Sequence, residues 1–516
     1  MDVIVGGGVV GLSIAWRLAR RGREVLVVDP SPARGASYAA AGMLAPISEV
    51  AFTEEPLLRL GAASLRRWPA FAAALAADAG LTPDGPPPPA DTALAAGVGP
   101  TSRAGTDLTA DAGRTPPTGT TNAGRAPLAA ADAARTPPAD VGLAADAGHP
   151  SPADAARPVG SGGAGAGAEW LAAARAGLDL RDDGTLDVAF GSDDLAMLDE
   201  QARFMEKLGL PVERLTGREC RRLEPMLAPT VRGGLLARTD AWVDPRRVTA
   251  ALLAALDRLG VPVVRARVTE LLRDGGGRVT GVRLTPAEPA PGPATTIGPS
   301  ARPETAPAAL RAALPASLSA TTPAALRADM PPAVPVGALR RAAQVPETLV
   351  AERVVLAAGA WSGELAEVPV RPVKGQIMRL RSPQPLLGRC VRGTVHGNPV
   401  YLVPRGDGEL VVGATQEELG FDTRVTAGGV YELLRDAREL VPGVTELEVA
   451  DVVAGLRPGT PDNLPVIGPS GIPGLVLATG HHRGGVLLTP LTTAILEGEE
   501  TDLATLCSPA RFRDVA

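Results

Sequence analysis

Three glycines and one acid near the start of the chain have types and a spacing that could hold a dinucleotide. Gly6, Gly8 and Gly11 form a G-x-G-x-x-G pattern, and Asp29 follows further along. In such a pattern the first glycine allows a tight turn, the second lets backbone N–H groups approach a pyrophosphate, and the third lets a helix pack closely against a strand. An acid placed like Asp29 can accept hydrogen bonds from a ribose. A glycine turn that binds nothing is the alternative, but it leaves Asp29 unexplained.

The segments around these residues are the ones that a dinucleotide site requires. Residues 3–5 form a β-branched run, residues 12–19 carry apolar side chains at helical spacing, and residues 25–28 form a second apolar run that ends at Asp29. Arg20, Arg21 and Gly22 are typical of the last turn and the end of a helix. The pattern therefore predicts a β-α-β unit, which is the context that the glycine motif needs.

The composition of the 516 residues indicates a globular body and excludes several classes of protein. Hydrophobic residues make up 45% of the chain, and the net charge is −6 without a cluster of Lys and Arg, so we expect no nucleic-acid partner. No apolar run reaches the length of a membrane span, which is about 18 residues. The N-terminus lacks the basic segment of a signal peptide. Because the three cysteines are far apart, we expect no disulfide framework and no metal site, and we predict a cytoplasmic protein.

Two segments of biased composition interrupt the chain. Residues 83 to about 169 consist mainly of Pro, Ala, Gly, Thr and Asp and contain no aromatic residue, and residues 286–346 are similar. Such segments cannot bury enough apolar surface to offset the entropy that ordering them costs. We therefore predict two low-complexity insertions, at 83–177 and 286–346, that form surface loops; a partner-binding role for either is the alternative.

Apolar periodicity predicts the other elements that position the candidate site. The predicted helices are 57–81, 193–208, 247–259, 429–440 and a last helix that begins near Gly484. The predicted strands are 184–190, 231–237, 268–272, 279–284, 350–356, 400–404 and 409–414.

Motifs along the whole chain, outside the two insertions, resemble those of FAD-dependent amine oxidases of the D-amino-acid oxidase superfamily. Within it the chain is most similar to the glycine oxidase family of thiamine biosynthesis. Besides the opening glycine motif, the matching segments are AAAGMLAP (39–46), VLAAGAWS (355–362), PVKGQ (372–376), YLVP (401–404), GLRP (455–458) and GHHRGGVLL (480–488).

The resemblance implies an α/β chain, α+β overall, with a Rossmann-like FAD-binding domain and a substrate domain that is built on an antiparallel sheet. We place the discontinuous FAD-binding domain at residues 1–82, 220–285, 347–370 and 450–516, and the substrate domain at residues 178–219 and 371–449.

The activity that the resemblance implies is oxidation of glycine, sarcosine or small D-amino acids to an imine. Hydride passes to flavin N5, O2 is reduced to H2O2, and the imine hydrolyses to glyoxylate and ammonia or supplies thiazole synthesis. We expect non-covalent FAD, a small amino acid and O2 as partners, contacts with thiazole-synthesis proteins, no membrane, and a homo-oligomer, which the family suggests is a tetramer. The expected mechanism is hydride transfer from the neutral amine, with no essential acid–base residue. Positioning then supplies much of the acceleration, since well-oriented reactions gain about 7–11 kcal/mol.

Three side chains are candidates for the substrate site. A planar guanidinium binds a carboxylate through a bidentate pair, and Arg457, which precedes a turn of proline and glycine, is our first choice for the substrate carboxylate. By the family pattern Tyr401 adds a hydroxyl contact to the same carboxylate, and Arg483 lies near the other side of the pocket. A surface salt bridge for Arg457 and a plain strand aromatic for Tyr401 are the alternatives.

The cofactor residues are carried over from the family pattern or from the glycine motif. We expect them to be Gly6, Gly8, Val9, Val10, Gly11, Asp29, Pro30, Ala36, Ser37, Ala41, Gly42, Met43, Val268, Gly359, His481, His482, Arg483, Gly484, Gly485, Val486 and Leu487. The run from Gly484 to Leu487 would open the last helix and point N–H groups at the flavin. The family usually has an aromatic residue and an asparagine where this chain has His482 and Gly484. We expect no metal at His481 and His482, because adjacent residues do not face the same way.

Other interpretations stay open. A D-amino-acid dehydrogenase would pass electrons to a quinone and would need a membrane-facing patch, which the sequence does not show. A sarcosine-oxidase-like enzyme with covalent flavin would need a placed cysteine, and neither Cys390 nor Cys507 stands in the expected motif. A catalytically inactive FAD-binding module is the alternative of another class, and the presence of both Arg457 and Tyr401 argues against it. The sequence does not rank glycine, sarcosine and small D-amino acids.

Overall fold

The computed structural model describes residues 1–49, 54–85, 164–287 and 345–515. Most of both predicted insertions therefore lies outside the described residues. The elements discussed below belong to one compact unit, which covers residues 1–91 and 165–516.

A six-stranded sheet carries the N-terminal glycine motif. Its order is β18-β19-β12-β1-β2-β8, and all neighbouring strands are parallel except the edge strand β18. The motif lies between β1 (Asp2–Val5) and α1 (Val9–Arg20), and β2 (Val25–Val28) follows, so the predicted β-α-β unit is confirmed. The other strands are β8 (Val263–Val264), β12 (Arg353–Leu356), β18 (Val466–Pro469) and β19 (Leu475–Thr479).

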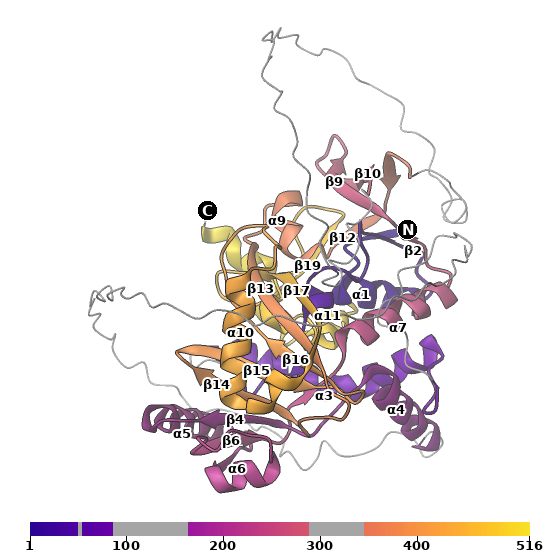
Figure 1. The fold of residues 1–516 in the computed structure, drawn as a ribbon. Coiled ribbons are helices and arrows are strands. Elements are labelled where there is room, and N and C mark those ends of the chain that lie inside the picture. Colours follow the sequence, from indigo (N-terminus) through magenta and orange to yellow (C-terminus); the bar gives the residue numbers. More distant parts are fainter. Residues whose placement is uncertain (50–53, 86–163, 288–344, 516) are drawn as a thin grey trace, which may run out of the picture. The chain divides into compact units, whose positions relative to one another are not determined.

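Side chains on the two faces of this sheet alternate between two separate cores. Ile4 and Val27 belong to a core shared with α1, α3 (Glu55–Ala79), α7 (Pro245–Arg258) and α11 (Thr489–Leu496). Val3 and Leu26 face the opposite way, toward β9 (Ala266–Arg273), β10 (Val279–Pro286) and β11 (Thr348–Val350). Figure 1 shows β2 and β12 between these layers, with β9 and β10 on one side and α1 and α7 on the other. Both faces are buried, as the uniformly apolar strands require.

The second sheet has eight strands in the order β17-β13-β16-β15-β14-β4-β6-β5. All its pairs are antiparallel except β4 with β14, so the predicted antiparallel substrate sheet is largely confirmed. The strands are β4 (Thr185–Ala189), β5 (Glu213–Thr216), β6 (Gly233–Ala237), β13 (Arg371–Arg381), β14 (Cys390–Val395), β15 (Asn398–Pro404), β16 (Glu409–Gly413) and β17 (Glu448–Gly459).

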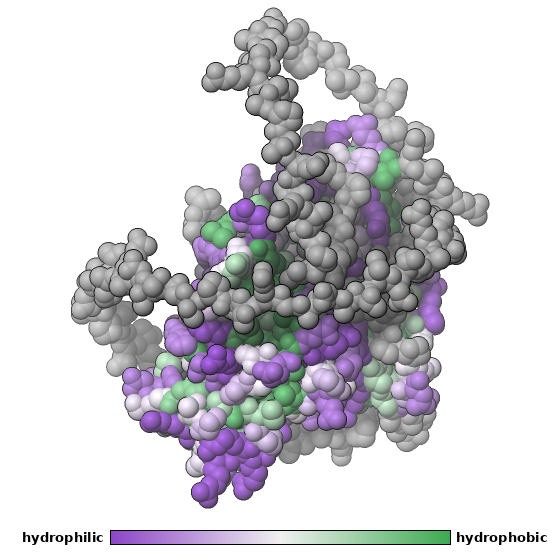
Figure 2. Space-filling view, in the orientation of Figure 1, coloured by the Kyte–Doolittle hydropathy of each residue, from purple (hydrophilic) through white to green (hydrophobic). Residues whose placement is uncertain are grey.

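Helices cover one face of the eight-stranded sheet. The helix α10 (Ala427–Leu440) packs Leu433, Ala437 and Leu440 into a core with β13, β14 and β15. The helix α6 (Gly217–Leu223) covers the same face, with Cys220 in the core that contains Leu186 and Leu236. The helix α5 (Ser192–Lys207) lies on the opposite face, where Met205 packs with Ala237. On the face drawn in Figure 2, the part of the molecule that Figure 1 labels α6 is mainly hydrophilic, as expected of a helix on the surface.

Three boundaries differ from the sequence-based expectation. The strand β17 and the strand β6 belong to the eight-stranded sheet, although we had placed residues 450–516 and 220–285 in the FAD-binding domain. The helix α4 (Ala164–Leu178) occupies the end of the segment predicted as the first insertion. Its Ala173 and Ala174 are fully buried in the core of the six-stranded sheet, and Trp170 and Leu171 pack against that core, so tertiary packing stabilises this helix.

Candidate active site

One large cavity is lined by most of the predicted cofactor residues and by the three predicted substrate residues. Its volume is about 1540 Å³, which exceeds the range of about 300–1,000 Å³ of typical small-molecule sites. The glycine turn after β1 lines one part, and β13, β15 and β17 of the eight-stranded sheet line another. The cavity is therefore large enough for a dinucleotide and a small substrate side by side.

The glycine turn has the close packing that its motif predicts. A side chain at Gly11 would overlap the carbonyl oxygen of Gly6, so only glycine lets α1 approach β1 here. A Cβ at Gly8 would meet only the Ser37 Oγ, at 3.4 Å, and Gly8 lines the cavity. The backbone at Gly8 is thus accessible to a ligand, whereas Gly11 acts through packing and does not line the cavity.

Asp29 closes the turn from the end of β2. Its carboxylate accepts hydrogen bonds from the Gly7 N–H, at 2.7 Å, and the Ser31 N–H, at 2.6 Å. Burial raises the pKa of Asp29, and these two hydrogen bonds oppose the rise. Asp29 lines the cavity beside Arg267, whose charge also favours the carboxylate. Ser37 caps α1 by accepting a hydrogen bond from the Val9 N–H, at 2.9 Å.

Register in the eight-stranded sheet aligns the candidate substrate residues on one face. Tyr401 on β15 stands opposite Arg392 on β14 and opposite Gly413 on β16, and Gly413 stands opposite Ile377 on β13. Directly opposite residues share a face, and side chains alternate along a strand. Since Ile377 pairs with Val453, four residues before Arg457 on β17, Arg457 lies on this same face. The sheet therefore brings together Arg392, Tyr401 and Arg457, and all three line the cavity.

The guanidinium of Arg457 has hydrogen-bond partners but no acidic partner. Its Nη1 donates to the carbonyl oxygens of Thr415, at 3.2 Å, and Lys374, at 3.5 Å. Within the described residues, no carboxylate lies within 4 Å of it. Gly375 leaves the space that the guanidinium fills, because a side chain there would overlap Arg457. A fixed cation that faces a cavity without a counter-ion is suited to an anionic ligand, and the surface salt bridge considered as the alternative is absent among the described residues.

Tyr401 is held as a neutral phenol. Burial raises its pKa to about 12, and Glu49 adds to the rise, whereas Arg457 opposes it. The ring lies against Gly413, where any side chain would overlap it. Tyr401 can therefore donate a hydrogen bond to an anion at any ordinary pH.

Arg483 reaches the cavity, but its charge is compensated. The guanidinium forms an ion pair with Glu54 and donates a hydrogen bond to the carbonyl oxygen of Glu49, at 3.1 Å. Its position beside the pocket agrees with the sequence-based expectation. Its partners show that it mainly holds the segment around Glu49.

Most of the remaining predicted cofactor residues also line the cavity. They are Gly6, Val9, Val10, Pro30, Ala36, Ser37, Ala41, Gly42, Met43, Val268, Gly359, His481, His482, Gly485 and Val486.

Gly484 and Leu487 do not line the cavity, and the segment around them differs from the prediction. The last helix, α11, begins at Thr489 and follows a 3₁₀ turn at His482–Gly484, so the run from Gly484 to Leu487 precedes the helix. The Leu487 carbonyl accepts hydrogen bonds from Ser64 Oγ, at 2.6 Å, and Trp68 Nε1, at 3.0 Å. These bonds fix the turn against α3.

The two adjacent histidines are uncharged at neutral pH. Burial lowers the pKa of both His481 and His482 to about 4. His481 Nε2 lies 2.9 Å from Thr492 Oγ1 on α11, which gives His481 a structural partner. Across the described part of the chain, no group of three or more metal-ligating side chains is found.

Sequence reasoning missed three charged residues next to the substrate face. Glu49 and Arg392 line the cavity, and Asp240 is fully buried behind Glu49. Glu49 stands three residues after the recognised AAAGMLAP segment, which was the one signal that could have pointed to it. Arg392 and Asp240 stand in no motif and become neighbours only through the fold.

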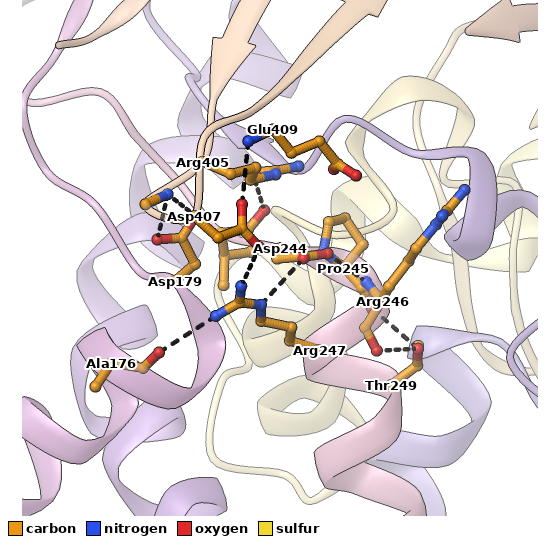
Figure 3. A network of polar contacts seen from close by, with 12 residues as sticks. Ala176, Asp179, Asp244, Pro245, Arg246, Arg247, Thr249, Arg405, Asp407 and Glu409 are labelled. Carbon is orange, nitrogen blue, oxygen red and sulfur yellow. Dashed lines mark hydrogen bonds and ion pairs between the residues drawn. The ribbon is translucent and has the colours of Figure 1, made fainter. Parts of the chain in front are cut away.

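A polar network that runs from the buried Arg405 to the exposed Asp407 joins the cofactor side of the cavity to the substrate sheet. Arg405, at the end of β15, donates hydrogen bonds to the carbonyl oxygens of Val243, at 3.0 Å, and Ala41, at 2.5 Å. Arg247 on α7 pairs with Asp407 at 2.7 Å and with Asp244 at 3.4 Å, as Figure 3 shows. Because Ala41 lines the cavity, this network fixes the cofactor side relative to β15 and β16.

A family model described as FAD dependent oxidoreductase matches residues 3–96, 162–298 and 326–496. This match covers more than half of the chain. The chain belongs to the family of FAD dependent oxidoreductases.

The curated relatives that the chain matches include proteins named ThiO/ThiG and glycine oxidase. The chain is 43% identical over 146 residues to a bifunctional protein ThiO/ThiG from Nostoc sp., a match that covers 28% of this chain and 22% of the relative. It is 41% identical over 169 residues to a glycine oxidase from Geobacillus kaustophilus, covering 30% and 44%. These alignments thus span less than half the length of the curated relatives. The crystal structure of glycine oxidase from Geobacillus kaustophilus aligns with a TM-score of 0.64 and 25% identity, over 98% of this chain and 97% of that one.

The residues of the cavity fit the cofactor of the family. FAD carries a pyrophosphate, which the accessible backbone at Gly8 and the start of α1 would hold, and a ribose, which Asp29 would hold. The three cysteines are buried and free, and burial raises the pKa of the Cys390 thiol. None of the helices that the structure describes is long and apolar enough to cross a membrane.

Proposed function

We propose that the protein oxidises glycine and other small amines, such as sarcosine and small D-amino acids, with non-covalent FAD and O2. The amine loses two electrons and two protons to give an imine, and O2 takes them up to give H2O2. With glycine, water then hydrolyses the imine to glyoxylate and ammonia. One observation carries this proposal: the Arg457 guanidinium, without an acidic partner within 4 Å among the described residues, faces the cavity that the glycine turn also lines.

Arg457 and Tyr401 would bind the substrate carboxylate. The guanidinium offers a charge-assisted pair of hydrogen bonds, and the neutral Tyr401 hydroxyl adds a third donor on the same sheet face. Both side chains lie against a glycine of a neighbouring strand. The Arg457 guanidinium fills the space beside Gly375, and the Tyr401 ring fills the space beside Gly413. The carboxylate would thus be fixed at one end of the cavity.

Positioning then supplies much of the rate acceleration. FAD, when bound, accepts the two electrons of the amine and passes them to oxygen. The chain orients the substrate by its carboxylate so that the Cα–H faces the cofactor, and such orientation contributes about 7–11 kcal/mol in favourable cases. In this mechanism no side chain is an essential acid or base.

The names of the relatives support a role in the supply of thiazole synthesis. The matched Nostoc protein is named ThiO/ThiG, and further matched relatives are named glycine oxidase. We therefore propose that the imine product feeds thiazole synthesis and that proteins of that process are partners. Assembly as a homo-oligomer and a cytoplasmic location stay predictions from the sequence and its resemblance.

A peroxide assay tests the proposed function. Purified protein should be yellow and should release H2O2 when glycine or sarcosine is added in air. A colourless protein that takes up no FAD would contradict the cofactor assignment. A yellow protein inert with every small amine would favour an FAD-binding module without turnover, and reduction of the flavin with slow reoxidation by O2 would favour a dehydrogenase.

A further inference from the structure

Glu49 lines the cavity together with the substrate residues Tyr401 and Arg457. In the sequence it follows the AAAGMLAP segment, which carries predicted cofactor residues. It is half-buried, and it follows β3 (Met43–Leu44). The positive charges that act on it are those of Arg392, Arg483 and Arg457. No described Arg or Lys, however, lies within the 4 Å of an ion pair with its carboxylate.

Three side chains, those of Asp240, Arg392 and Arg483, hold the backbone that carries Glu49. Asp240 accepts hydrogen bonds from Ser48 Oγ, at 2.6 Å, from the Ser48 N–H, at 3.1 Å, and from the Ile47 N–H, at 3.3 Å. Arg392 donates to the Ser48 carbonyl, and Arg483 donates to the Glu49 carbonyl at 3.1 Å. These contacts hold the backbone of residues 47–49, and the Glu49 side chain lines the cavity from that backbone.

The carboxylate of Glu49 lies near three guanidinium groups but forms no ion pair among the described residues. Burial raises the pKa of its carboxyl, and the nearby guanidinium groups oppose that rise. Arg392 is already paired, since its Nε lies 3.6 Å from Asp187 on β4, and Arg483 is paired with Glu54. Arg457 is the cation of this group without an acidic partner among the described residues. On the substrate face, Arg457 is therefore the cation, and Glu49 the anion, without an ion pair among the described residues.

A small amino acid carries the complementary pair of charges. We propose that Glu49 binds the amino group of the substrate while Arg457 binds its carboxylate, so that the cavity selects compounds bearing both groups. This inference rests on the proposed function for the identity of the ligand, and it adds a residue that determines specificity. Acids that lack an amino group would keep the Arg457 contact and lose the Glu49 contact.

Binding of two ligands that differ by one amino group tests this assignment. The holoprotein is titrated with acetate, which shifts the flavin absorption spectrum when it binds, and with glycine in the absence of oxygen. The glycine affinity comes from the concentration dependence of flavin bleaching or, without bleaching, from the spectral shift. In Glu49→Gln the glycine affinity should fall about 10- to 100-fold, the worth of a charge-assisted hydrogen bond. The acetate affinity should stay unchanged or increase, because a negative charge has been removed.

Two further variants separate binding from structural damage. Glu49→Asp keeps the charge and should recover part of the glycine affinity. Glu432→Gln removes an exposed acid from another part of the cavity wall, on α10, and should change neither affinity. Equal weakening of glycine and acetate in Glu49→Gln, or no change in either, would overturn the assignment.

The same titrations separate this inference from the proposed function. If the wild-type protein binds glycine without bleaching or peroxide release, the proposed oxidation is wrong, and the ratio of glycine to acetate affinity still decides the role of Glu49. If the wild-type protein binds neither ligand, both proposals are wrong.

Discussion

The guanidinium of Arg457 lies across Gly375 on the neighbouring strand, in the space that any side chain at position 375 would need. Strand register thus makes room for the cation that we assign to the substrate carboxylate. The PVKGQ segment and the GLRP segment, which are separate motifs in the sequence, meet at this point.

Replacing Gly375 by alanine should displace the guanidinium without removing it. We expect Gly375→Ala to raise the KM for glycine about tenfold or more, because a shift of about 1 Å in a binding group has a large effect on catalysis. The flavin content should stay that of the wild type. Gly428→Ala is the control, because a Cβ at Gly428, in α10, would meet nothing within 4 Å. An unchanged KM in Gly375→Ala would show that the guanidinium position is unimportant.

The packing of α1 against β1 should determine cofactor retention. A side chain at Gly11 would overlap the Gly6 carbonyl oxygen, so Gly11→Ala must move the turn that would hold the pyrophosphate. We expect a protein with strongly reduced flavin absorbance and a lower melting temperature. Gly275→Ala, in the turn between β9 and β10 where a Cβ would meet nothing within 4 Å, should leave both quantities unchanged. Full flavin content in Gly11→Ala would contradict the proposed cradle.

The Tyr401 hydroxyl should contribute a single hydrogen bond to substrate binding. Tyr401→Phe is expected to raise the KM for glycine about 2- to 13-fold, which corresponds to about 0.5–1.5 kcal/mol. Because burial raises the pKa of Tyr401 to about 12, its proton stays on up to that pH, so phenol ionisation should not weaken binding between about pH 7 and 10. Tyr431→Phe, at an exposed tyrosine of α10, is the matched control. A KM as low as that of the wild type in Tyr401→Phe would remove the hydroxyl from the site.

Asp240 should make the stability of the protein depend on pH. Burial raises its pKa from the usual 3.8 to about 7, and the hydrogen bonds from Ser48 and Ile47 oppose the rise. Between these two values the folded protein binds a proton that the unfolded chain has lost, so this group destabilises the fold increasingly as the pH rises toward about 7. The accumulated cost above pH 7 is at most about 4 kcal/mol.

Asp240→Asn removes this titration and should flatten the pH dependence. Melting temperatures measured from about pH 5 to pH 8 should fall less in the variant than in the wild type. Asp193→Asn, at an exposed acid of α5, should keep the wild-type slope. Parallel curves for Asp240→Asn and the wild type would exclude Asp240 as the titrating group.

The sequence predicted the β-α-β unit of the candidate cofactor site because its signals are local. The turn from Gly6 to Gly11, the helix after it and Asp29 are close in the chain, and their spacing alone indicates a β-α-β unit. Tyr401 and Arg457 came from motifs of the family, and strand register then placed them on one face. The space left by Gly375 depends on which strands are neighbours, and spacing along the chain does not contain that information.

Other features depended on packing between distant segments. Asp240 and Arg392 belong to no motif. Asp240 lies next to the site because its buried carboxylate accepts a hydrogen bond from Ser48, and Arg392 because β14 pairs with β15. The Ala- and Gly-rich sequence of α4 gives no apolar pattern that predicts a helix. Its stability comes from the core that Ala173 and Ala174 enter, and that core forms only in the folded chain. The membership of β6 and β17 in the eight-stranded sheet likewise follows from pairing partners that the sequence does not name.

Binding of the substrate carboxylate depends most directly on Arg457, and one comparison tests this role. The KM for glycine and the flavin content are measured for Arg457→Ala, with Arg424→Ala, at an exposed arginine paired with Asp422, as the control. We predict a KM raised about 30-fold or more in Arg457→Ala, as expected when one partner of a charged pair is removed, with the flavin content of the wild type. A glycine KM equal to that of the control, or a loss of flavin in proportion to the loss of glycine binding, would contradict the assignment of Arg457 to the substrate carboxylate.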